Sequence, residues 1–216
     1  MTNLSLPAAL VFCALAWAVV QEKTRFNFED AEPGKLPAGW SVAETEPAGT
    51  PAAWRVEKDQ AAGGSKALGM GENQNSGSTY NMCLNEKSWP ADLAMVVRLR
   101  ADGGTEDQGG GLVWRLKDAK NYYIARWNPL ERNIRVYKVH NGKRTQFATA
   151  NVDTDAKAWH ELKIAMHGRK ITVHLDGKQY LEHEDGTFAE GGKIGFWTKA
   201  DARTSFDDLE VETGGK

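Results

Sequence analysis

Residues 107–131 read DQGGGLVWRLKDAKNYYIARWNPLE, and this stretch decides the fold. Two runs rich in Val, Leu, Ile, Trp and Tyr flank a polar break at residues 117–120. Such a pattern predicts a β-hairpin with a connection of about four or five residues.

Side chains along a strand point alternately to the two faces of a sheet, so the residues of this hairpin sort by parity. The apolar sets on one face are Leu112, Trp114 and Leu116 with Tyr123, Ala125 and Trp127. Matching these sets leaves Arg115, Tyr122, Arg126 and Asn128 together on the second face. Arginines and an amide among aromatic rings in mid-strand are not typical of a plain solvated face. The second face is therefore the predicted binding surface.

The composition is that of a turn-rich β protein. The chain has 216 residues, 41% of them hydrophobic, with 22 glycines, eight tryptophans and a formal net charge of −2. A nearly neutral chain without a basic run argues against nucleic-acid binding, which depends mainly on neutralising phosphates. With a short leader removed, the chain is long enough for one domain with a substantial core.

The N-terminus carries the only long apolar run, Leu4 to Val20. This run is too short for a membrane span, which needs about 20 apolar residues. It also offers the small-x-small pattern of signal peptidase sites. We interpret residues 1–20 as a signal peptide and expect a secreted or periplasmic protein without a membrane span after removal of the leader. Phe12 stands where a lipobox needs a small residue, so lipidation of Cys13 is not expected.

Turn signals divide the rest of the chain into short strands. Asn141-Gly142 favours a type I′ turn, and Asp176-Gly177 marks another hairpin. About 13 short strands with hairpin connections and no capped 3.6-residue period predict a two-sheet antiparallel sandwich. We expect a single domain over residues 21–212, followed by a loose tail at residues 213–216.

Parity extends the predicted binding surface to neighbouring strands. Arg135 and Tyr137 fall opposite an apolar set, and Trp197 and Lys199 do the same near the C-terminus. Trp197 offers a platform for a sugar's C–H face, and arginines offer forked hydrogen bonds. Further polar groups are expected at the rim: Gln108, Asn128 and Asp201. The alternative is that the arginines pair with Asp107, Glu131 or Asp201 to hold loops.

Several other groups have candidate roles in metal binding or catalysis. Glu29, Asp30, Asp207 and Asp208 are candidate ligands of a structural calcium ion, with capping of loop N–H groups by Asp207 or Asp208 as the alternative. The five histidines show no zinc-binding spacing, and no other cofactor is expected. His160 and His174 are candidate general bases, and Glu182 with Glu184 is a nominal glycosidase carboxylate pair.

Four further tryptophans and the lone mature cysteine are assigned to the interior. Cys83 is expected to be a buried, inert thiol. Four tryptophans near strand ends are expected in the core rather than at a ligand: Trp40, Trp54, Trp89 and Trp159.

Several motifs together resemble one known family. They are FNFED at residues 26–30, the 107–131 stretch, WHELKI at 159–164, LDG at 175–177, GFWTKAD at 195–201 and FDDLEV at 206–211. Over residues 25–212 the chain resembles the bacterial 3-keto-disaccharide hydrolase, or family 16 glycoside hydrolase-like, group. That resemblance implies a concanavalin A-like, laminin-G-type jelly roll. The Glu-x-Asp-x-x-Glu strand of family 16 glucanases is absent, and the pattern differs from the NSGI type, so no catalytic residue is carried over.

Three functions follow as hypotheses. The first is a saccharide-binding jelly roll using the polar face, expected to be a monomer. The second is a glycoside or 3-keto-disaccharide hydrolase or lyase, in which a base takes a proton next to the keto group and arginine steadies the enolate. The third is a structural or adhesive surface domain.

Overall fold

The computed structural model describes residues 22–48, 51–60, 62–71, 73, 75–77 and 79–214, so the expected leader lies outside the described residues. The described residues form 15 strands and no helix. In chain order the strands are β1 (Glu22–Phe26), β2 (Trp40–Thr45), β3 (Trp54–Lys58), β4 (Lys66–Met70), β5 (Tyr80–Trp89), β6 (Leu93–Gly103), β7 (Gly110–Asp118), β8 (Asn121–Asn128), β9 (Asn133–His140), β10 (Lys143–Asn151), β11 (His160–His167), β12 (Lys170–Leu175), β13 (Lys178–Glu184), β14 (Gly192–Lys199) and β15 (Arg203–Thr213).

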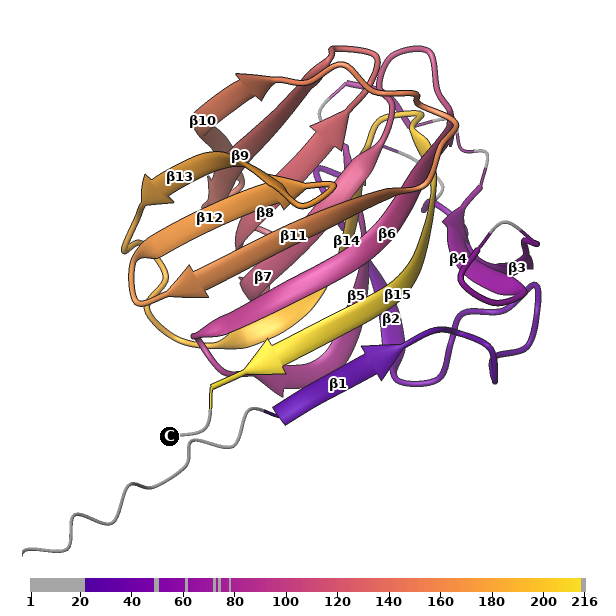
Figure 1. The fold of residues 1–216 in the computed structure, drawn as a ribbon, viewed down its shortest axis with the longest axis horizontal. Helices are drawn as coiled ribbons and strands as arrows, with labels where there is room; N and C mark the ends of the chain where they lie inside the picture. Colours follow the sequence, from indigo (N-terminus) through magenta and orange to yellow (C-terminus); the bar gives the residue numbers. More distant parts are fainter. Residues whose placement is uncertain are drawn as a thin grey trace, which may run out of the picture.

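Two antiparallel sheets pack face to face as a sandwich (Figure 1). Sheet A has the order β13-β12-β11-β6-β15-β4-β3, with β1 paired to β15, and sheet B has the order β10-β9-β8-β7-β14-β5-β2. Apolar side chains from both sheets form one core between them. The predicted jelly-roll β-sandwich is confirmed.

The hairpin at residues 107–131 lies in the middle of sheet B as β7 and β8. Its connection is only Ala119 and Lys120, shorter than expected. The parity prediction holds for most of its residues. Those that enter the inter-sheet core are Leu112, Trp114, Tyr123, Ala125 and Trp127.

A β-bulge breaks this parity near the end of β7. The β7–β8 register shifts between Trp114 and Asp118, and Arg115 has a φ of 47°. The extra residue turns the following side chain over, as bulges do. Leu116 therefore packs with the second face and not with Leu112, so its predicted placement was wrong.

The second face of sheet B is also buried, because the sheet curls on itself. Thr45 Oγ1 of β2 lies 2.6 Å from the Tyr122 hydroxyl of β8, although three strands stand between them in the sheet. From the opposite edge, the Arg144 guanidinium of β10 lies 4.8 Å from the Tyr80 ring centroid of β5. We call this second side the rolled face. Its hydrophobic members are Tyr80, Met82, Leu84, Val113, Leu116, Tyr122, Ile124, Tyr137, Val139 and Trp197.

The expected core residues are mostly confirmed. Trp40, Trp54 and Trp89 lie in the inter-sheet core, and Cys83 is fully buried. Trp159 is an exception, because its half-buried ring lies beneath the guanidinium groups of two arginines of β6. Thr213 still belongs to β15 and pairs with Glu22, so the expected tail begins too early.

Candidate functional site

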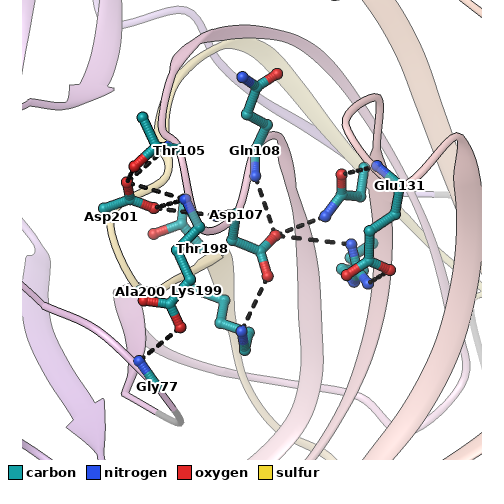
Figure 2. Close-up of polar contacts among 12 residues, drawn as sticks. Gly77, Thr105, Asp107, Gln108, Glu131, Thr198, Lys199, Ala200 and Asp201 are labelled. Atoms are coloured by element: carbon teal, nitrogen blue, oxygen red, sulfur yellow. Dashed lines mark hydrogen bonds and ion pairs between the residues drawn. The ribbon is translucent and has the colours of Figure 1, made fainter.

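Charged side chains gather where three loops meet at one end of the rolled face (Figure 2). The loops span residues 104–109, 129–132 and 200–202, and we call this end of the rolled face the mouth. Asp107 lies at its centre and is 2% exposed. Its Oδ1 accepts hydrogen bonds from the Asn128 amide at 2.6 Å and from the Gln108 N–H at 3.1 Å. Its Oδ2 lies 3.1 Å from Lys199 Nζ.

The carboxylate of Asp201 shapes one wall of the mouth. It accepts the backbone N–H groups of Thr105, Glu106 and Asp107, which fixes the loop that presents Asp107 (Figure 2). These bonds outweigh partial burial and lower the pKa of Asp201. The preceding residue, Ala200, has a φ of 50°, which is a strained conformation for a residue with a Cβ. The loop geometry is thus held rigidly around the site.

Arg126 is the most deeply buried cation of the mouth, with 2% exposure. Its Nη2 donates to Glu131 Oε2 at 2.9 Å, and its Nη1 lies 3.8 Å from Asp107 Oδ1. That longer distance is ionic contact without a hydrogen bond, and the N–H groups at Nε and Nη1 have no hydrogen-bond partner. Arg135 also reaches Glu131, with Nη1 at 2.7 Å from Oε2.

The two carboxylates of the mouth are shifted in opposite directions. Burial raises the pKa of Asp107, and the charges of Arg126 and Lys199 only partly offset this effect. For Glu131, burial is outweighed by the hydrogen bond from Asn133 and by Arg126, which lower the pKa to about 2. Glu131 therefore favours its ionised form and pairs with two arginines, whereas the pKa of Asp107 is shifted toward the neutral form.

Aromatic rings line the rolled face next to this charged cluster. The Arg144 guanidinium lies 4.6 Å from the Tyr137 ring centroid and 6.0 Å from that of Trp197. Arg126 also lies 6.0 Å from the Tyr137 ring. Arg144 is half-buried, and its Nη1 has no hydrogen-bond partner. Two guanidinium groups with unsatisfied N–H groups thus lie against the same tyrosine.

Most of the site residues predicted from sequence meet here. The residues at the mouth are Gln108, Arg126, Asn128, Arg135, Tyr137, Trp197, Lys199 and Asp201. Tyr122 is on the same face but is fully buried, and its hydroxyl lies 2.6 Å from Thr45 Oγ1. The pairing of Arg126 with Asp107 and Glu131, stated as the alternative, is also present.

Arg115 does not lie on the rolled face, and the prediction that placed it there was wrong. The bulge directs its guanidinium to the far end of the sandwich, where it donates to the carbonyls of Ala91, Phe188 and Gly168. It also lies 3.3 Å from Asp92 Oδ1. Arg115 ties loops of both sheets together, and its side chain is 1% exposed.

Four residues of the mouth were not predicted as site residues: Tyr80, Asp107, Glu131 and Arg144. Asp107 and Glu131 carried a signal, because acidic residues flank the two ends of the organising hairpin. Arg144 and Tyr80 carried none. They belong to strands far apart in the chain, and only the curl of sheet B brings them together.

The carboxylates considered for calcium serve other contacts. Glu29 accepts the N–H groups of Ser65 and Lys66, Asp207 accepts that of Gly63, and Asp208 pairs with Arg25. Within the described ranges, no group of three or more His, Cys, Asp or Glu side chains is arranged to hold a metal ion. Asp207 therefore fits the alternative of loop capping.

The histidine and glutamate candidates for catalysis are engaged elsewhere. His160 Nδ1 lies 2.7 Å from Asp176 Oδ2, and its Nε2 lies 2.7 Å from the Asp155 carbonyl. Burial lowers the pKa of His174, which lies on sheet A away from the mouth. Glu182 forms an ion pair with Lys170 at 2.9 Å at the edge of the same sheet.

Comparison with known proteins identifies the family. Residues 26–212 match the 3-keto-alpha-glucoside-1,2-lyase-like domain. The chain belongs to this family. A segment of 106 residues is 29% identical to levanase from Bacillus subtilis (strain 168), covering 48% of this chain and 15% of levanase. The chain thus spans under a sixth of the length of that relative.

Solved structures share the fold. The carbohydrate-binding module CBM66 from Bacillus subtilis superposes with a TM-score of 0.64 at 21% identity, covering 81% of this chain and 96% of the module. Cellulose induced protein Cip1 gives a TM-score of 0.62 at 12% identity over 87% of this chain and 96% of Cip1. A glycosyl hydrolase family protein from Mycobacterium fortuitum gives 0.58 at 15% identity, covering 87% and 98%. Across the described part of the chain, no helix is long and apolar enough to cross a membrane.

Proposed function

We propose that this chain is a saccharide-binding domain whose sugar binds at the mouth. Arg126, Arg135, Arg144 and Lys199 supply donors, and Glu131 supplies an acceptor. Sugar hydroxyl groups donate and accept at once, so they can join such a mixed set. The C–H face of a sugar ring also complements aromatic rings. The names of the fold's relatives, which include a carbohydrate-binding module, support the proposal.

One observation carries the proposal: the unsatisfied N–H groups of Arg126 and Arg144. A buried donor without a partner costs about 1–3 kcal/mol, and more when it is charged. Folds rarely retain such groups without a reason. Acceptor oxygens of a ligand would satisfy them, so binding would recover energy that the unliganded domain lacks.

Access requires a small movement at the mouth. Tyr137 is 3% exposed and Trp197 is 1% exposed, so their rings are covered when no ligand is present. The half-buried side chain of Arg144 covers these rings. Its rotation would give up cation–π contacts, but it would also release the Nη1 group that has no hydrogen-bond partner. We propose that a sugar displaces Arg144 and takes its place against the rings. Leu130, which is 48% exposed beside Glu131, would widen the contact surface.

The test is calorimetric titration with disaccharides, oligosaccharides and their 3-keto derivatives. Arg135→Ala is the informative variant, because this side chain is partly exposed and can be removed without opening the core. The matched control is Arg132→Ala, an exposed arginine just before β9 that pairs with Asp153 away from the cluster. We expect at least a tenfold loss of affinity for the first variant only. Equal affinities in both variants would refute binding at the mouth.

The family name favours one alternative, a lyase acting on 3-keto glucosides. The role of base would fall to Asp107, whose pKa is raised by burial, with Arg126 stabilising the enolate. In such an elimination the proton next to the keto group passes to the base, a C=C bond forms as the glycosidic C–O bond breaks, and the leaving oxygen takes up a proton and departs as an alcohol.

Mass spectrometry of products separates the two functions. If the lyase proposal is right, the chain converts 3-keto disaccharides, and Asp107→Asn abolishes conversion while leaving binding measurable. Binding without any product would leave the binding domain as the function. The absence of both binding and product would favour the structural or adhesive role.

We further propose a secreted or periplasmic, monomeric domain. The names of its relatives denote proteins that act on or bind carbohydrates, which fits such a location. Light scattering of the purified chain tests the monomer: a mass near twice 23.8 kDa would contradict it.

A further inference from the structure

A groove of about 550 Å³ lies on the outer face of sheet A, away from the mouth's aromatic rings. It crosses four neighbouring strands, β3, β4, β15 and β6, where β3 and β4 form the side of the sandwich (Figure 1). The alternate residues Val56, Leu68 and Phe206 of these strands face the inter-sheet core. The volume falls in the range of small-molecule sites, which is about 300–1,000 Å³.

The floor of the groove lacks side chains, which lets charged groups lie flat across it. A Cβ on Gly71 would stand 3.3 Å from Arg55 Nη2, and a Cβ on Gly69 would stand 3.4 Å from Glu57 Oε2. Arg55 Nε donates to Glu57 Oε1 at 2.8 Å above this floor. Larger residues at the two glycines would lift the pair and fill the groove.

The opposite wall is a fixed row of paired polar groups. Arg100 lies 2.6 Å from both Asp59 and Asp102, and Asp102 accepts the hydroxyl of Ser205 at 2.6 Å. The Arg100 guanidinium also lies 4.9 Å from the ring centroid of Trp159. These side chains are largely buried, between 13% and 30% exposed for the three charged groups. The wall is therefore organised before any ligand arrives.

The alternation of charges selects the chemistry of the ligand. A phosphate or carboxylate would lie among three carboxylates, and a metal ion would lie among four cations. The carboxylates are Glu57, Asp59 and Asp102, and the cations are Arg55, Lys58, Arg100 and Arg203. A hydroxyl group can accept from a guanidinium and donate to the adjacent carboxylate, so it leaves neither charge unpaired. A row of such pairs fits a chain of neighbouring hydroxyl groups on a neutral ring.

We propose that this groove is a second saccharide site, specific for neutral sugars. It deepens the proposed function, since it assumes that the domain binds sugars, but it uses none of the residues of the mouth. Two sites on one small domain would let it hold a polysaccharide by avidity, which multiplies affinity when both sites engage.

Amide chemical shifts of the ¹⁵N-labelled chain can follow both sites separately. Sucrose, trehalose and cellobiose are titrated as neutral probes, with inorganic phosphate and calcium chloride as charged ones. Gly69 and Gly71 report on the groove, and Thr105 and Ala200 report on the mouth. We expect a neutral disaccharide to shift the groove amides, and Arg55→Ala/Glu57→Ala to raise the dissociation constant there at least tenfold. Both side chains are more than 40% exposed, so the double variant should fold.

The outcomes distinguish the two proposals. Saturable shifts at the groove that vanish in the double variant, with mouth shifts unchanged, support the second site. Shifts confined to the mouth overturn the second site and leave the proposed function standing. Shifts confined to the groove support the second site and move sugar binding away from the mouth. Groove shifts with phosphate or calcium alone, or no shifts at all, overturn the second site.

Discussion

The two sides of sheet B are buried to the same degree but built from different chemistry. On the inter-sheet side, Leu112, Trp114 and Phe196 are fully buried in an apolar core. On the rolled face, Trp197 is 1% exposed and Tyr122 is fully buried, yet hydroxyl and guanidinium groups lie among the rings. The first side is sufficient for a sandwich. The rolled face contains polar groups that cost stability and that the sandwich does not require. Such a cost is expected at a functional face.

The largest effect is expected in the inter-sheet core. Phe196→Ala would remove a ring stacked on Trp40 at 5.2 Å and on Phe206 at 4.6 Å. We expect the free energy of unfolding to fall by about 3–5 kcal/mol, as for other buried aromatic truncations. Chemical denaturation measures this loss, with Phe196→Leu as the milder control. A loss below that of the rolled-face variants would reverse the comparison.

A smaller loss is expected for the buried cation of the mouth. Arg126→Met leaves Asp107 with only Lys199 as a partner of opposite charge. We expect a loss of about 2–3 kcal/mol, somewhat below that for breaking a fully buried ion pair. The double variant Arg126→Met/Asp107→Asn should recover part of it. Additive losses in this double-mutant cycle would show that the two groups are uncoupled.

A hydroxyl pair contributes to the closure of the roll. Tyr122→Phe removes the bond to Thr45, and we expect a loss of about 0.5–1.5 kcal/mol. Thr45→Val removes the same bond and also the bond that Thr45 donates to the Ala119 carbonyl, so its loss should be larger. The two substitutions combined should cost little more than Thr45→Val alone, and denaturation curves of all three proteins provide the check.

Removing the cover of the mouth should change stability only slightly. Arg144→Ala loses cation–π contacts with Tyr80 and Tyr137, worth about 0.5–1 kcal/mol each, but it also removes a buried N–H group that has no hydrogen-bond partner, which offsets part of the loss. The indole N–H resonance of Trp197 should shift and exchange faster with solvent. An unchanged Trp197 signal would mean that something other than Arg144 covers the rings.

The last effect concerns pH. The pKa of Glu131 is depressed from 4.5 to about 2 in the folded chain, so its contribution is present above pH 4.5 and is lost as pH falls toward 2. Wild type should therefore lose stability relative to Glu131→Gln across that interval. Denaturation at several pH values between 5 and 2.5 tests this. A constant difference would show that the arginines do not depend on this carboxylate.

Local patterns were enough to predict the two-sheet sandwich and many of the side chains that share the second face of sheet B. Alternation placed Arg126, Asn128 and Tyr137 on one face, and turn dipeptides such as Asn141-Gly142 marked the hairpins. The bulge at Arg115 could not be predicted, because one inserted residue leaves the alternating pattern readable in either register. Burial of the second face was also missed. It depends on the curl of a whole sheet, which no short window of sequence contains.

The contact that closes the roll also sets the order in which the domain can assemble. Thr45 and Tyr122 are 77 residues apart in the chain, whereas β9 and β10 or β11 and β12 pair across tight turns. Contacts between residues that are distant in the chain form slowly, because the entropy of closing a long loop is lost before the contact stabilises the chain. Local hairpins are therefore expected first and the meeting of β2 with β8 late. On a ribosome, β2 must wait for the central hairpin to be synthesised, so the mouth is among the last parts of the domain to become competent.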